Sequence, residues 1–432
     1  LDEEAHPLSA RIARTVIRSA RRFTYEEAQE IIDTGTGDHA EAILTLHALA
    51  QKLRARRFER GSIAFDRPEV RFELDEAGKP IEVHIKESKP AHQLIEEFML
   101  LANRTVAERI AEPGRRDITP AITLKGKPAF VYRIHEAPDE EKLRSLADFV
   151  RRFGYRLKTE GGGEAIAKSL NQLLTDIKGR PEEDMLTMLA IRSMAKARYT
   201  TAHIGHYGLG FASYTHFTSP IRRYPDLMVH RLLAKYAEGG RSVSAKKYEE
   251  LCEHCSEREL VAATAERASI KYKQTEFMAD RIGQEFDGVI SGVTEFGIYV
   301  EDTLSKCEGM VPMRDLSSDY YEFDEDNYRL VGRRTRRVYN LGDKVRFRVE
   351  HANLERRQLD FSIIEEDSLI TYDSQSSAAR SVLHNQRGLT PERFGKKKAN
   401  KRAKSYGKSA SAKASSKGKK AAKKGKKAKK RK

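Results

Sequence analysis

Apolar residues recur every three or four positions in several stretches of the first 280 residues, and this period predicts helices. One helix is expected to begin after Thr24, a suitable N-cap residue, because Glu26 and Glu27 would then occupy its first turn. Further helices are predicted over residues 38–60 and 91–111, after Pro181, after Pro225, and over one long stretch from 244 to about 282. The amino-terminal two thirds of the chain is therefore expected to be rich in helix.

Apolar and polar residues alternate one by one in two other stretches, a pattern typical of half-buried strands. Residues 13–19 are expected to form a strand. Residues 61–88 alternate on both sides of a turn at 76–79, which predicts a β-hairpin. Since these strands do not alternate regularly with the helices, the pattern indicates the α+β class, and we expect one α+β domain over residues 1–282.

The pattern changes at Gly283, beyond which the chain is rich in glycine, valine and aromatic residues and alternates with period two. Five short strands are predicted between residues 283 and 366, the last two joined by a turn that contains asparagine. This number of strands fits a small closed barrel of the OB type. The acidic stretch 320–328 is expected to be a solvated loop of that barrel.

Three aromatic residues, Phe286, Phe296 and Tyr299, fall on the predicted barrel near arginine and lysine residues. Aromatic rings on such barrels serve as platforms on which single-stranded bases stack. Packing in the barrel core explains any one of them equally well, whereas the set of three favours nucleic-acid binding.

The formal net charge of +16 is concentrated at the carboxyl end of the chain. Residues 396–432 contain 19 lysines or arginines and no acidic residue, so the rest of the chain carries 16 − 19 = −3. A segment of this composition cannot bury a core, and we expect residues 367–432 to form a linker and a disordered tail. A solubilising role is one interpretation. We favour a polyanion-binding arm for RNA, including the ribosome and other RNA-rich assemblies.

The composition also bears on location. The mean hydropathy is −0.65, and no apolar run approaches the roughly 18 residues that a membrane span needs, so no membrane association is expected. The first residues lack the apolar core of a secretion signal, and three cysteines are too few for a disulfide framework. These features favour a cytoplasmic location. Because the chain begins at Leu1 and not at a methionine, we expect it to be a fragment of a longer protein.

The stretch 216–233, HFTSPIRRYPDLMVHRLL, places Arg222 and Arg223 between two prolines and directly before a predicted helix. The free amides and positive dipole end of a helix N-terminus attract anions, and two guanidinium groups add forks that match phosphate oxygens. The prolines restrict the backbone, so the arginines are presented at a low ordering cost. We therefore predict a phosphate-binding site here, with an ordinary exposed arginine pair as the alternative.

Residues 216–233 resemble the signature of the RNB family of processive 3′→5′ exoribonucleases, the ribonuclease II/R family. Further motifs occur in the order of that family, namely TVIRSARRFTYEEAQEIID, FDRPEVRFELDEAGKP, LIEEFMLLANRTVAE, IGHYGLGFASYTHFTSPIRRY and AERASIKYKQTEFM. The predicted barrel, with FDGVISGVTEFGIYVE, resembles the OB-fold RNA-binding domain of the ribosomal-protein type that closes these enzymes. The lysine-rich tail resembles that of the ribonuclease R branch, and the resemblance spans residues 12–432.

The resemblance implies Mg²⁺-dependent hydrolysis of RNA from its 3′ end to nucleoside 5′-monophosphates. The substrate would be single-stranded RNA, or structured RNA with a 3′ overhang, that threads a channel too narrow for a duplex. The resemblance assigns Arg222 to the phosphate near the scissile bond. It assigns Glu96 either to contact with the 3′-terminal nucleotide or to the ordering of nearby groups. It assigns Tyr25 to the wall of the catalytic cavity and Phe65 to stacking on the terminal bases. Further contacts to RNA are expected from Arg223 and His216.

The chain departs from the family pattern in its first residues. In the family, a cluster of aspartates upstream of the motif at 15–33 holds the metal ions, but the eleven residues before Ile12 contain only Asp2, Glu3 and Glu4 in another spacing. The cold-shock domains expected upstream are missing too. Since Mg²⁺ is held by carboxylates, we predict no metal site in this chain and no RNA cleavage by the chain alone. The alternative is a non-catalytic RNA-binding protein that retains the RNA channel, the barrel and the basic arm.

Three other groups of residues could carry chemistry. Cys252 and Cys255 have the spacing of zinc ligands, but no second cysteine or histidine pair lies at zinc-site distance, so structural cysteines are favoured. Residues 407–409, GKS, lack the upstream glycine of a phosphate-binding loop. Four histidines lie close in sequence, namely His203, His206, His216 and His230. Roles in the core or in contact with RNA are favoured for them, and a shared metal site is the alternative.

Overall fold

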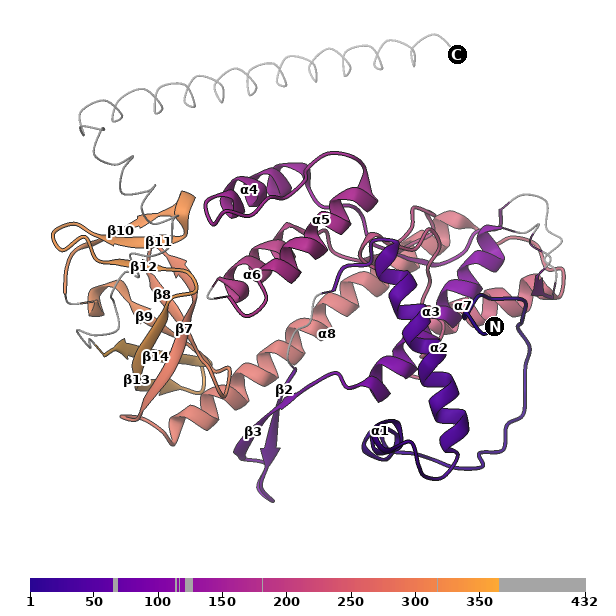
Figure 1. Ribbon diagram of the computed structural model, residues 1–432, viewed down its shortest axis with the longest axis horizontal. Helices are drawn as coiled ribbons and strands as arrows, with labels where there is room; N and C mark the ends of the chain where they lie inside the picture. The colour runs from indigo at the N-terminus through magenta and orange to yellow at the C-terminus, as the bar shows by residue number, and fades with distance from the viewer. Residues whose placement is uncertain are drawn as a thin grey trace, which may run out of the picture. The chain divides into compact units, whose positions relative to one another are not determined.

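The structure is a computed structural model, and it describes residues 1–64, 69–112, 115, 117–120, 127–180, 182–316 and 318–364. Helices and short strands come first along the chain, and a closed β-barrel follows them (Figure 1). The predicted fold, an α+β domain followed by an OB-type barrel, is confirmed. Phe65, Pro181 and the lysine-rich tail lie outside the described residues, so the predictions for them stay predictions. Within the described residues, no helix is both long and apolar enough to cross a membrane.

Three helices near the amino end pack against one another, namely α1 (Tyr25–Thr34), α2 (Ala40–Glu59) and α3 (Pro90–Ala111). The hydroxyl of Thr24 accepts a hydrogen bond from the amide of Glu27, and the Glu27 carboxylate accepts one from the amide of Thr24. This reciprocal capping box starts α1 at the predicted residue. Pro90 occupies the first turn of α3, where its missing amide proton is not needed. The predicted helices in this region are confirmed.

The predicted hairpin is present, since β2 (Glu69–Leu74) pairs antiparallel with β3 (Pro80–Lys86). Gly78 has a φ of 78° in the turn between them, a conformation that favours glycine. A shorter pair comes from distant parts of the chain, where β1 (Ala10–Arg11) runs parallel to β4 (Ile118–Thr119).

The strand predicted over residues 13–19 is wrong. These residues form no strand with any described part of the chain, although they follow β1 directly. The side chains of Val16 and Ile17 are exposed, at 103% and 85%. A strand needs a hydrogen-bonding neighbour as well as an alternating pattern, and no neighbour is described beside this stretch.

A second group of helices comprises α4 (Glu140–Arg151), α5 (Gly163–Asp176) and α6 (Glu183–Ser193). Asp139 caps α4 by accepting hydrogen bonds from the amides of Glu141 and Lys142. The third of these helices is the one predicted after Pro181. The buried faces of the three helices share one core, to which Leu146, Val150, Leu170, Leu173, Leu186 and Ala190 belong.

The stretch 216–233 lies between a small sheet and two helices. The sheet pairs β5 (Tyr132–Ile134) with β6 (Arg198–Thr200), and the 3₁₀ turn η1 (Tyr207–Leu209) follows. The helices are α7 (Tyr224–Ala237) and α8 (Ala245–Ala279). Figure 1 shows α8 as one long helix. As predicted, Pro225 lies in the first turn of α7, and Leu232, Leu233 and Tyr236 are buried.

Cys252 and Cys255 lie on α8 with free thiols, buried in the core that α7 and α8 share. Burial raises the pKa of Cys252 to about 12, so its thiol is protonated and unreactive at neutral pH. The structural role predicted for the pair fits these positions.

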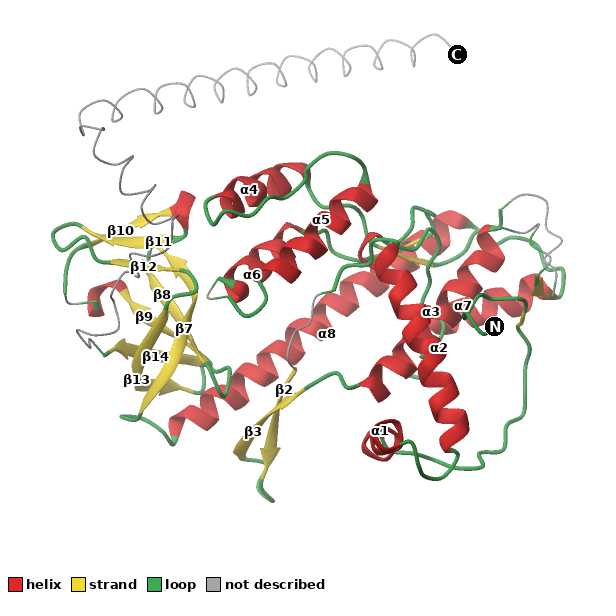
Figure 2. Ribbon diagram, in the orientation of Figure 1, coloured by secondary structure: helices red, strands yellow, loops and turns green. Residues whose placement is uncertain are grey.

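The barrel closes in the order β13–β14–β9–β8–β7 and contains the five predicted strands. They are β7 (Glu285–Thr294), β8 (Gly297–Asp302), β9 (Glu308–Pro312), β13 (Lys344–Asn353) and β14 (Gln358–Ile363), drawn in yellow in Figure 2. Phe347 and Phe361 stack in the interior with ring centroids 4.3 Å apart. A Cβ at Gly309 would lie 2.5 Å from the Phe361 ring, so this strand position has room only for glycine.

The prediction of a solvated loop at 320–328 is wrong. A separate antiparallel sheet lies between β9 and β13 in the sequence and consists of β10 (Tyr321–Asp324), β11 (Arg329–Gly332) and β12 (Val338–Asn340). The 3₁₀ turn η2 (Met313–Asp315) precedes this sheet, and the 3₁₀ turn η3 (Glu325–Asn327) joins β10 to β11. Tyr321, Leu330 and Tyr339 are buried in the core that the barrel shares. The acidic residues alternate with apolar ones, so the high charge of this stretch hid the period of a half-buried strand.

Candidate functional site

One face of α3 lines a cavity of about 240 Å³. His92, Glu96, Met99 and Asn103 follow one another at intervals of four, three and four residues, so they lie on one side of the helix. The remaining wall is supplied by Ile95 and Leu100 of α3, Tyr25 at the start of α1, and Tyr214, Thr218 and Arg223 before α7. The cavity thus brings together three of the predicted site residues, Tyr25, Glu96 and Arg223.

Tyr25 and His92 form the aromatic part of the cavity wall. Their rings stack with centroids 4.1 Å apart and an angle of 13° between planes. Burial lowers the pKa of His92, and the positive charge of Lys86 acts in the same direction, so the imidazole is neutral at pH 7. Tyr25 remains 44% exposed, which leaves part of this uncharged pair accessible to a base.

The two adjacent glutamates of α3 have different surroundings. The Oε1 atom of Glu97 accepts hydrogen bonds from Nε and Nη2 of Arg57 on α2, at 3.1 and 2.5 Å, and both side chains are buried. Glu96 lines the cavity with its side chain 51% exposed, and its contact with Arg57 is longer, at 3.4 Å. Glu97 therefore ties α2 to α3, whereas Glu96 presents a carboxylate that can accept a hydrogen bond from a hydroxyl group.

Asn103 connects α3 to the stretch that precedes α7. Its Nδ2 donates to the hydroxyl of Tyr214 at 3.1 Å, and its Oδ1 accepts from the amides of Phe217 and Thr218 at 2.9 and 3.2 Å. The side chain is almost completely buried, and buried hydrogen bonds of this kind are costly to leave unmade. Asn103 thereby fixes Thr218 at the cavity wall.

The two arginines of the motif separate in the structure. Arg223 lines the cavity, and its Nη2 donates to Oδ1 of the buried Asp226 at 2.7 Å. The same oxygen accepts from the amide of Ser219 at 2.8 Å, which holds the turn before α7. Arg222 is exposed, and its side chain makes no hydrogen bond or ion pair with any described residue. Its guanidinium is therefore available to a phosphate.

Several residues of the cavity wall carry buried polar atoms without a hydrogen-bond partner in the described part of the chain. They are Nδ1 of His92, Oγ1 of Thr218 and Nε of Arg223, together with Oδ2 of Asp226, which holds Arg223. Buried polar atoms are paired in the great majority of cases, and exceptions often mark functional sites. Their concentration at one cavity indicates a binding site.

Comparisons with known proteins identify the family of the chain. The RNB domain family matches residues 1–239, more than half of the chain, and the S1 RNA binding domain family matches residues 279–364. The chain belongs to the RNB family. Among curated relatives, ribonuclease R of Aquifex aeolicus is 39% identical over 84% of this chain and 51% of its own length. Ribonuclease R of Escherichia coli is 35% identical over 82% of this chain and 44% of its own length.

Solved structures show the same relationship. RNase R of Mycoplasma genitalium, in complex with ribose-methylated single-stranded RNA, has a TM-score of 0.71 at 25% identity, covering 79% of this chain and 53% of that one. Yeast Ssd1, a pseudonuclease, has a TM-score of 0.52 at 21% identity, covering 71% and 37%, which shows the fold alone. This RNB chain spans about half the length of the curated relatives it matches.

The residues of the RNB cavity do not by themselves form a magnesium site. Hydrolysis of phosphodiesters with magnesium draws on clustered carboxylates, whereas Glu96 is the single carboxylate among the residues that line the cavity. In the described residues, one group of three ligating side chains lies close together, namely Glu73, Glu82 and His84 on the β2–β3 hairpin. All three are exposed, and none lines the cavity. No step is therefore derived through a metal.

The histidines of the motif region have separate protein partners. His203 Nε2 lies 2.8 Å from Oγ of Ser213, and His230 Nε2 lies 2.9 Å from the carbonyl oxygen of Phe217. Burial lowers the pKa of His206 to about 3. These separate environments give no support to a shared metal site in the described part of the chain.

His216 is held among aromatic residues. Its Nδ1 lies 2.8 Å from the hydroxyl of Tyr199, and its ring meets Tyr199 and Tyr214 edge to face. Burial lowers the pKa of His216 to about 2, and the charges of Arg223 and Arg133 act in the same direction. The imidazole is therefore neutral and packs the motif, and a contact from His216 to RNA stays a prediction.

The three aromatic residues predicted on the S1 domain have different environments. Phe286 stacks on Phe347 at 5.8 Å and packs against the barrel core. Tyr299 is half-buried opposite Gly292, whose missing side chain leaves room for the ring. Phe296 is 69% exposed between β7 and β8, so of these three rings it is the most accessible to a base.

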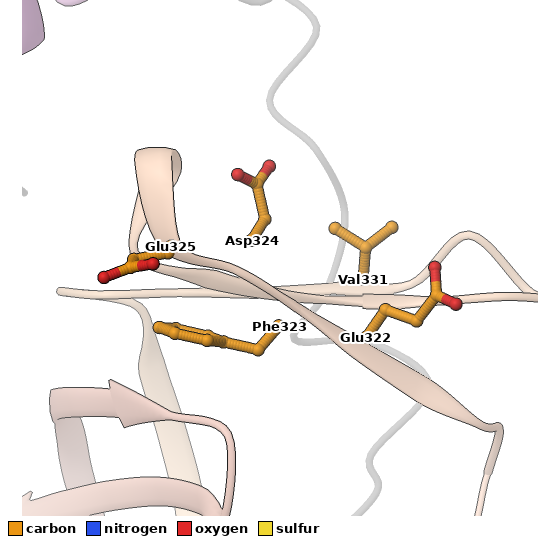
Figure 3. A pocket seen from close by; sticks show the side chains of 5 residues that line it. All are labelled: Glu322, Phe323, Asp324, Glu325 and Val331. Atoms are coloured by element: carbon orange, nitrogen blue, oxygen red, sulfur yellow. The ribbon is translucent and has the colours of Figure 1, made fainter. Parts of the chain in front are cut away.

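A second hollow, of about 460 Å³, lies on the β10–β11–β12 sheet of the S1 domain and is lined by Glu322, Phe323, Asp324, Glu325 and Val331 (Figure 3). Three of these residues are acidic, so the hollow repels phosphate. The Oδ2 atom of Asp324 also accepts a hydrogen bond from Nε of Arg329 at 2.9 Å. The acidic lining therefore makes this hollow unsuited to a phosphate group.

Sequence reasoning missed His92, Asn103, Tyr214 and Thr218 as residues of the cavity. A signal for two of them was present, since His92, Glu96 and Asn103 are polar residues spaced so that they share one face of the predicted helix. Tyr214 and Thr218 carried no such signal, because only the fold brings their stretch against α3.

Proposed function

We propose that this RNB chain binds the 3′ end of RNA in the cavity beside α3 and belongs to a processive 3′→5′ exoribonuclease of the ribonuclease R type. The observation that carries the proposal is the convergence of a stacked aromatic pair, the half-exposed carboxylate of Glu96 and the guanidinium of Arg223 at one cavity with unpaired buried polar atoms. This combination suits a nucleotide, which has a flat base, ribose hydroxyls and a phosphate.

Each group has a role that follows from its chemistry. The Tyr25–His92 pair offers a π-face to a base of any sequence. The carboxylate of Glu96 accepts a hydrogen bond from a ribose hydroxyl, a group that DNA lacks at the 2′ position. Arg222 neutralises a phosphate, and Arg223 lines the cavity in an orientation that Asp226 fixes.

We further propose that the chain by itself holds RNA without cleaving it. The family uses Mg²⁺, which neutralises the phosphate and activates water when bound. Since Glu96 is the single carboxylate of the cavity wall in the described residues, further acidic groups would be needed to hold the metal. The non-catalytic RNA-binding protein remains the second candidate, because the fold of an RNB domain does not by itself establish catalysis.

The proposed partners are single-stranded RNA and structured RNA with a 3′ overhang. The relative from Mycoplasma genitalium has been solved with single-stranded and with double-stranded RNA. The S1 domain of this chain, with its exposed Phe296, is proposed to help feed the strand. The lysine-rich tail is proposed to contact the ribosome or other RNA-rich assemblies, and a cytoplasmic location is proposed with it.

A binding and degradation time course tests this function. The full chain is incubated with Mg²⁺ and a 5′-labelled RNA that has a single-stranded 3′ tail, with EDTA in a parallel reaction. We expect the RNA to be bound and to stay full length. We expect Glu96→Gln to weaken binding of the 3′ end about tenfold, the equivalent of one charge-assisted hydrogen bond.

The matched control is Glu140→Gln, which removes the same charge from an exposed side chain of α4 and should leave RNA binding unchanged. Processive shortening that EDTA stops and Arg222→Ala abolishes would show that the chain holds metal ions through unassigned carboxylates, and the inactive-chain proposal would be wrong. An absence of RNA binding would overturn the whole proposal.

A further inference from the structure

The loop that joins β11 to β12 in the S1 domain carries four arginines within five residues, Arg333, Arg334, Arg336 and Arg337 around Thr335. We call residues 333–337 the arginine turn. It belongs neither to the cavity beside α3 nor to the five strands of the barrel. Because four positive charges are exposed together only where they serve a purpose or are neutralised, the partners of each arginine are informative.

The arginine turn is held in one conformation by a single carboxylate. The Oδ2 atom of Asp319 accepts hydrogen bonds from the amides of Arg334 and Thr335 at 2.8 and 2.5 Å, and from the Thr335 hydroxyl at 2.7 Å. A Cβ at Gly332 would lie 2.7 Å from the same oxygen, so glycine makes room for it. Desolvation alone would raise the pKa of Asp319, but the hydrogen bonds hold it at about 2. The turn is therefore fixed at neutral pH.

The arginines of the turn fall into two groups. Arg333 pairs with Glu322 at 2.5 Å, and the guanidinium of Arg337 lies 5.2 Å from the ring centroid of Tyr339. Arg334 and Arg336 are exposed and form no ion pair with a described residue. The one side-chain hydrogen bond of Arg334 goes to the carbonyl oxygen of Ser318 at 3.5 Å, which leaves most of its donors free.

An exposed aromatic residue contacts the arginine turn at Arg333. The carbonyl oxygen of Tyr320 accepts a hydrogen bond from the amide of Arg333 at 2.8 Å, so the two backbones are in contact. The side chain of Tyr320 is 84% exposed. Guanidinium forks beside an accessible ring match a phosphate and its base, the repeating unit of single-stranded RNA.

From these contacts we infer that the arginine turn is a second RNA-binding site, at which Arg334 and Arg336 contact phosphates of the strand and Tyr320 stacks on a base. This inference rests on the proposed RNA binding of the chain and adds a contact outside the cavity. The acidic hollow on the same sheet, seen in Figure 3, disfavours phosphate there and confines the contact to the turn. A long RNA reaches both sites, whereas an RNA of a few nucleotides fills one.

The double variant Arg334→Gln/Arg336→Gln of the full chain tests the inference by fluorescence anisotropy over a range of salt concentrations. We expect the affinity for a long single-stranded RNA to fall about tenfold. We also expect a slope of log affinity against log salt that is shallower by about 1.4, which is ~0.7 for each of two phosphates. Binding of a labelled tetranucleotide in the cavity should not change.

The control is Arg144→Gln/Arg151→Gln, which removes the same charge from two exposed side chains of α4. If the control weakens long-RNA binding as much as the test variant does, net charge explains the effect and the inference is wrong. An unmodified chain that binds no RNA would overturn the proposed function as well. Normal binding of the tetranucleotide with unchanged binding of long RNA by the test variant would overturn the inference alone.

A second variant separates the shape of the turn from its charge. Asp319→Ala removes a negative charge, so simple electrostatics predicts tighter RNA binding. Because the same change removes the hydrogen bonds that fix the turn, we expect the affinity for long RNA to fall severalfold instead. Unchanged or tighter binding by a variant whose circular dichroism matches the unmodified chain would contradict a preformed site.

Discussion

At the scale of single residues, neighbours in the sequence have separate roles because they face different surroundings. Glu96 and Glu97 differ by 100° around α3, and this rotation places one carboxylate at the cavity and the other against Arg57. Arg222 and Arg223 divide in the same way, one toward solvent and one toward Asp226. In both pairs the type of residue predicted its chemistry, and its environment decided which member is available to a ligand.

The glutamate pair supports a prediction about stability. Glu97→Ala leaves the buried guanidinium of Arg57 without its main partner, and breaking a buried ion pair in this way costs about 3–5 kcal/mol. We expect a lower midpoint of urea denaturation with an unchanged m-value. Glu96→Gln should change the free energy of unfolding by less than about 1 kcal/mol, because that side chain is half-exposed. Equal losses in the two variants would contradict the separation of roles.

At the scale of elements, the site depends on contacts between segments that are far apart in the sequence. The motif before α7 reaches the face of α3 through Asn103, which bonds to three of its residues. The start of α1 adds Tyr25, which the Thr24 capping box positions. The cavity is thus assembled by α1, α3 and the stretch before α7, and no one of these elements could form it alone.

Asn103→Ala tests this assembly. The change leaves a buried tyrosine hydroxyl and two amides without their partner, and we expect a loss of about 1–3 kcal/mol in the free energy of unfolding. RNA binding should also weaken, because Thr218 and Arg223 lose their fixed positions at the cavity. The readout is anisotropy with a tetranucleotide, measured where the variant is fully folded.

The control for this variant is Tyr236→Phe, at a buried position outside the cavity. The hydroxyl of Tyr236 donates a hydrogen bond to the carbonyl oxygen of Ala129 and accepts one from the amide of Val243, and the variant loses both. It should lower stability by a similar amount and leave RNA binding intact. If the two variants weaken RNA binding equally, the effect of Asn103 is only a general loss of stability.

At the scale of the whole molecule, the net positive charge is concentrated at the carboxyl end of the chain. Residues 396–432 contribute 19 positive charges, and the remainder carries −3. The RNA binding that we propose for the described part therefore rests on local groups, such as the cavity and the arginine turn, and not on net charge. A tail of this kind adds affinity that is sensitive to salt and insensitive to sequence.

Removal of residues 396–432 tests this division. We expect the affinity for long RNA to fall and its salt dependence to become shallower, by ~0.7 in slope for each phosphate that the tail contacts. The melting temperature of the remaining chain should stay within about 1 °C, because a lysine-rich segment without large aliphatic residues cannot bury a core. A large loss of thermal stability would contradict the assignment of the tail as a separate arm.

The sequence by itself determined the elements with strong local signals. The capping box at Thr24, the proline in the first turn of α7 and the long uninterrupted α8 are set by backbone preferences within a few residues, so the pattern predicted them correctly. The hairpin and the five barrel strands followed from alternation and turn residues. The motif at 216–233 indicated the family.

Only the tertiary structure decided where these residues meet. Residues 13–19 have no strand partner in the described part of the chain. The acidic stretch forms a sheet that buries Tyr321 and Leu330. The tertiary structure also placed Tyr214 and Thr218 at the cavity, which no local preference specifies. Strand pairing, burial and hydrogen bonds between distant segments depend on how the whole chain packs. The residues near one position in the sequence therefore determine these interactions only in part.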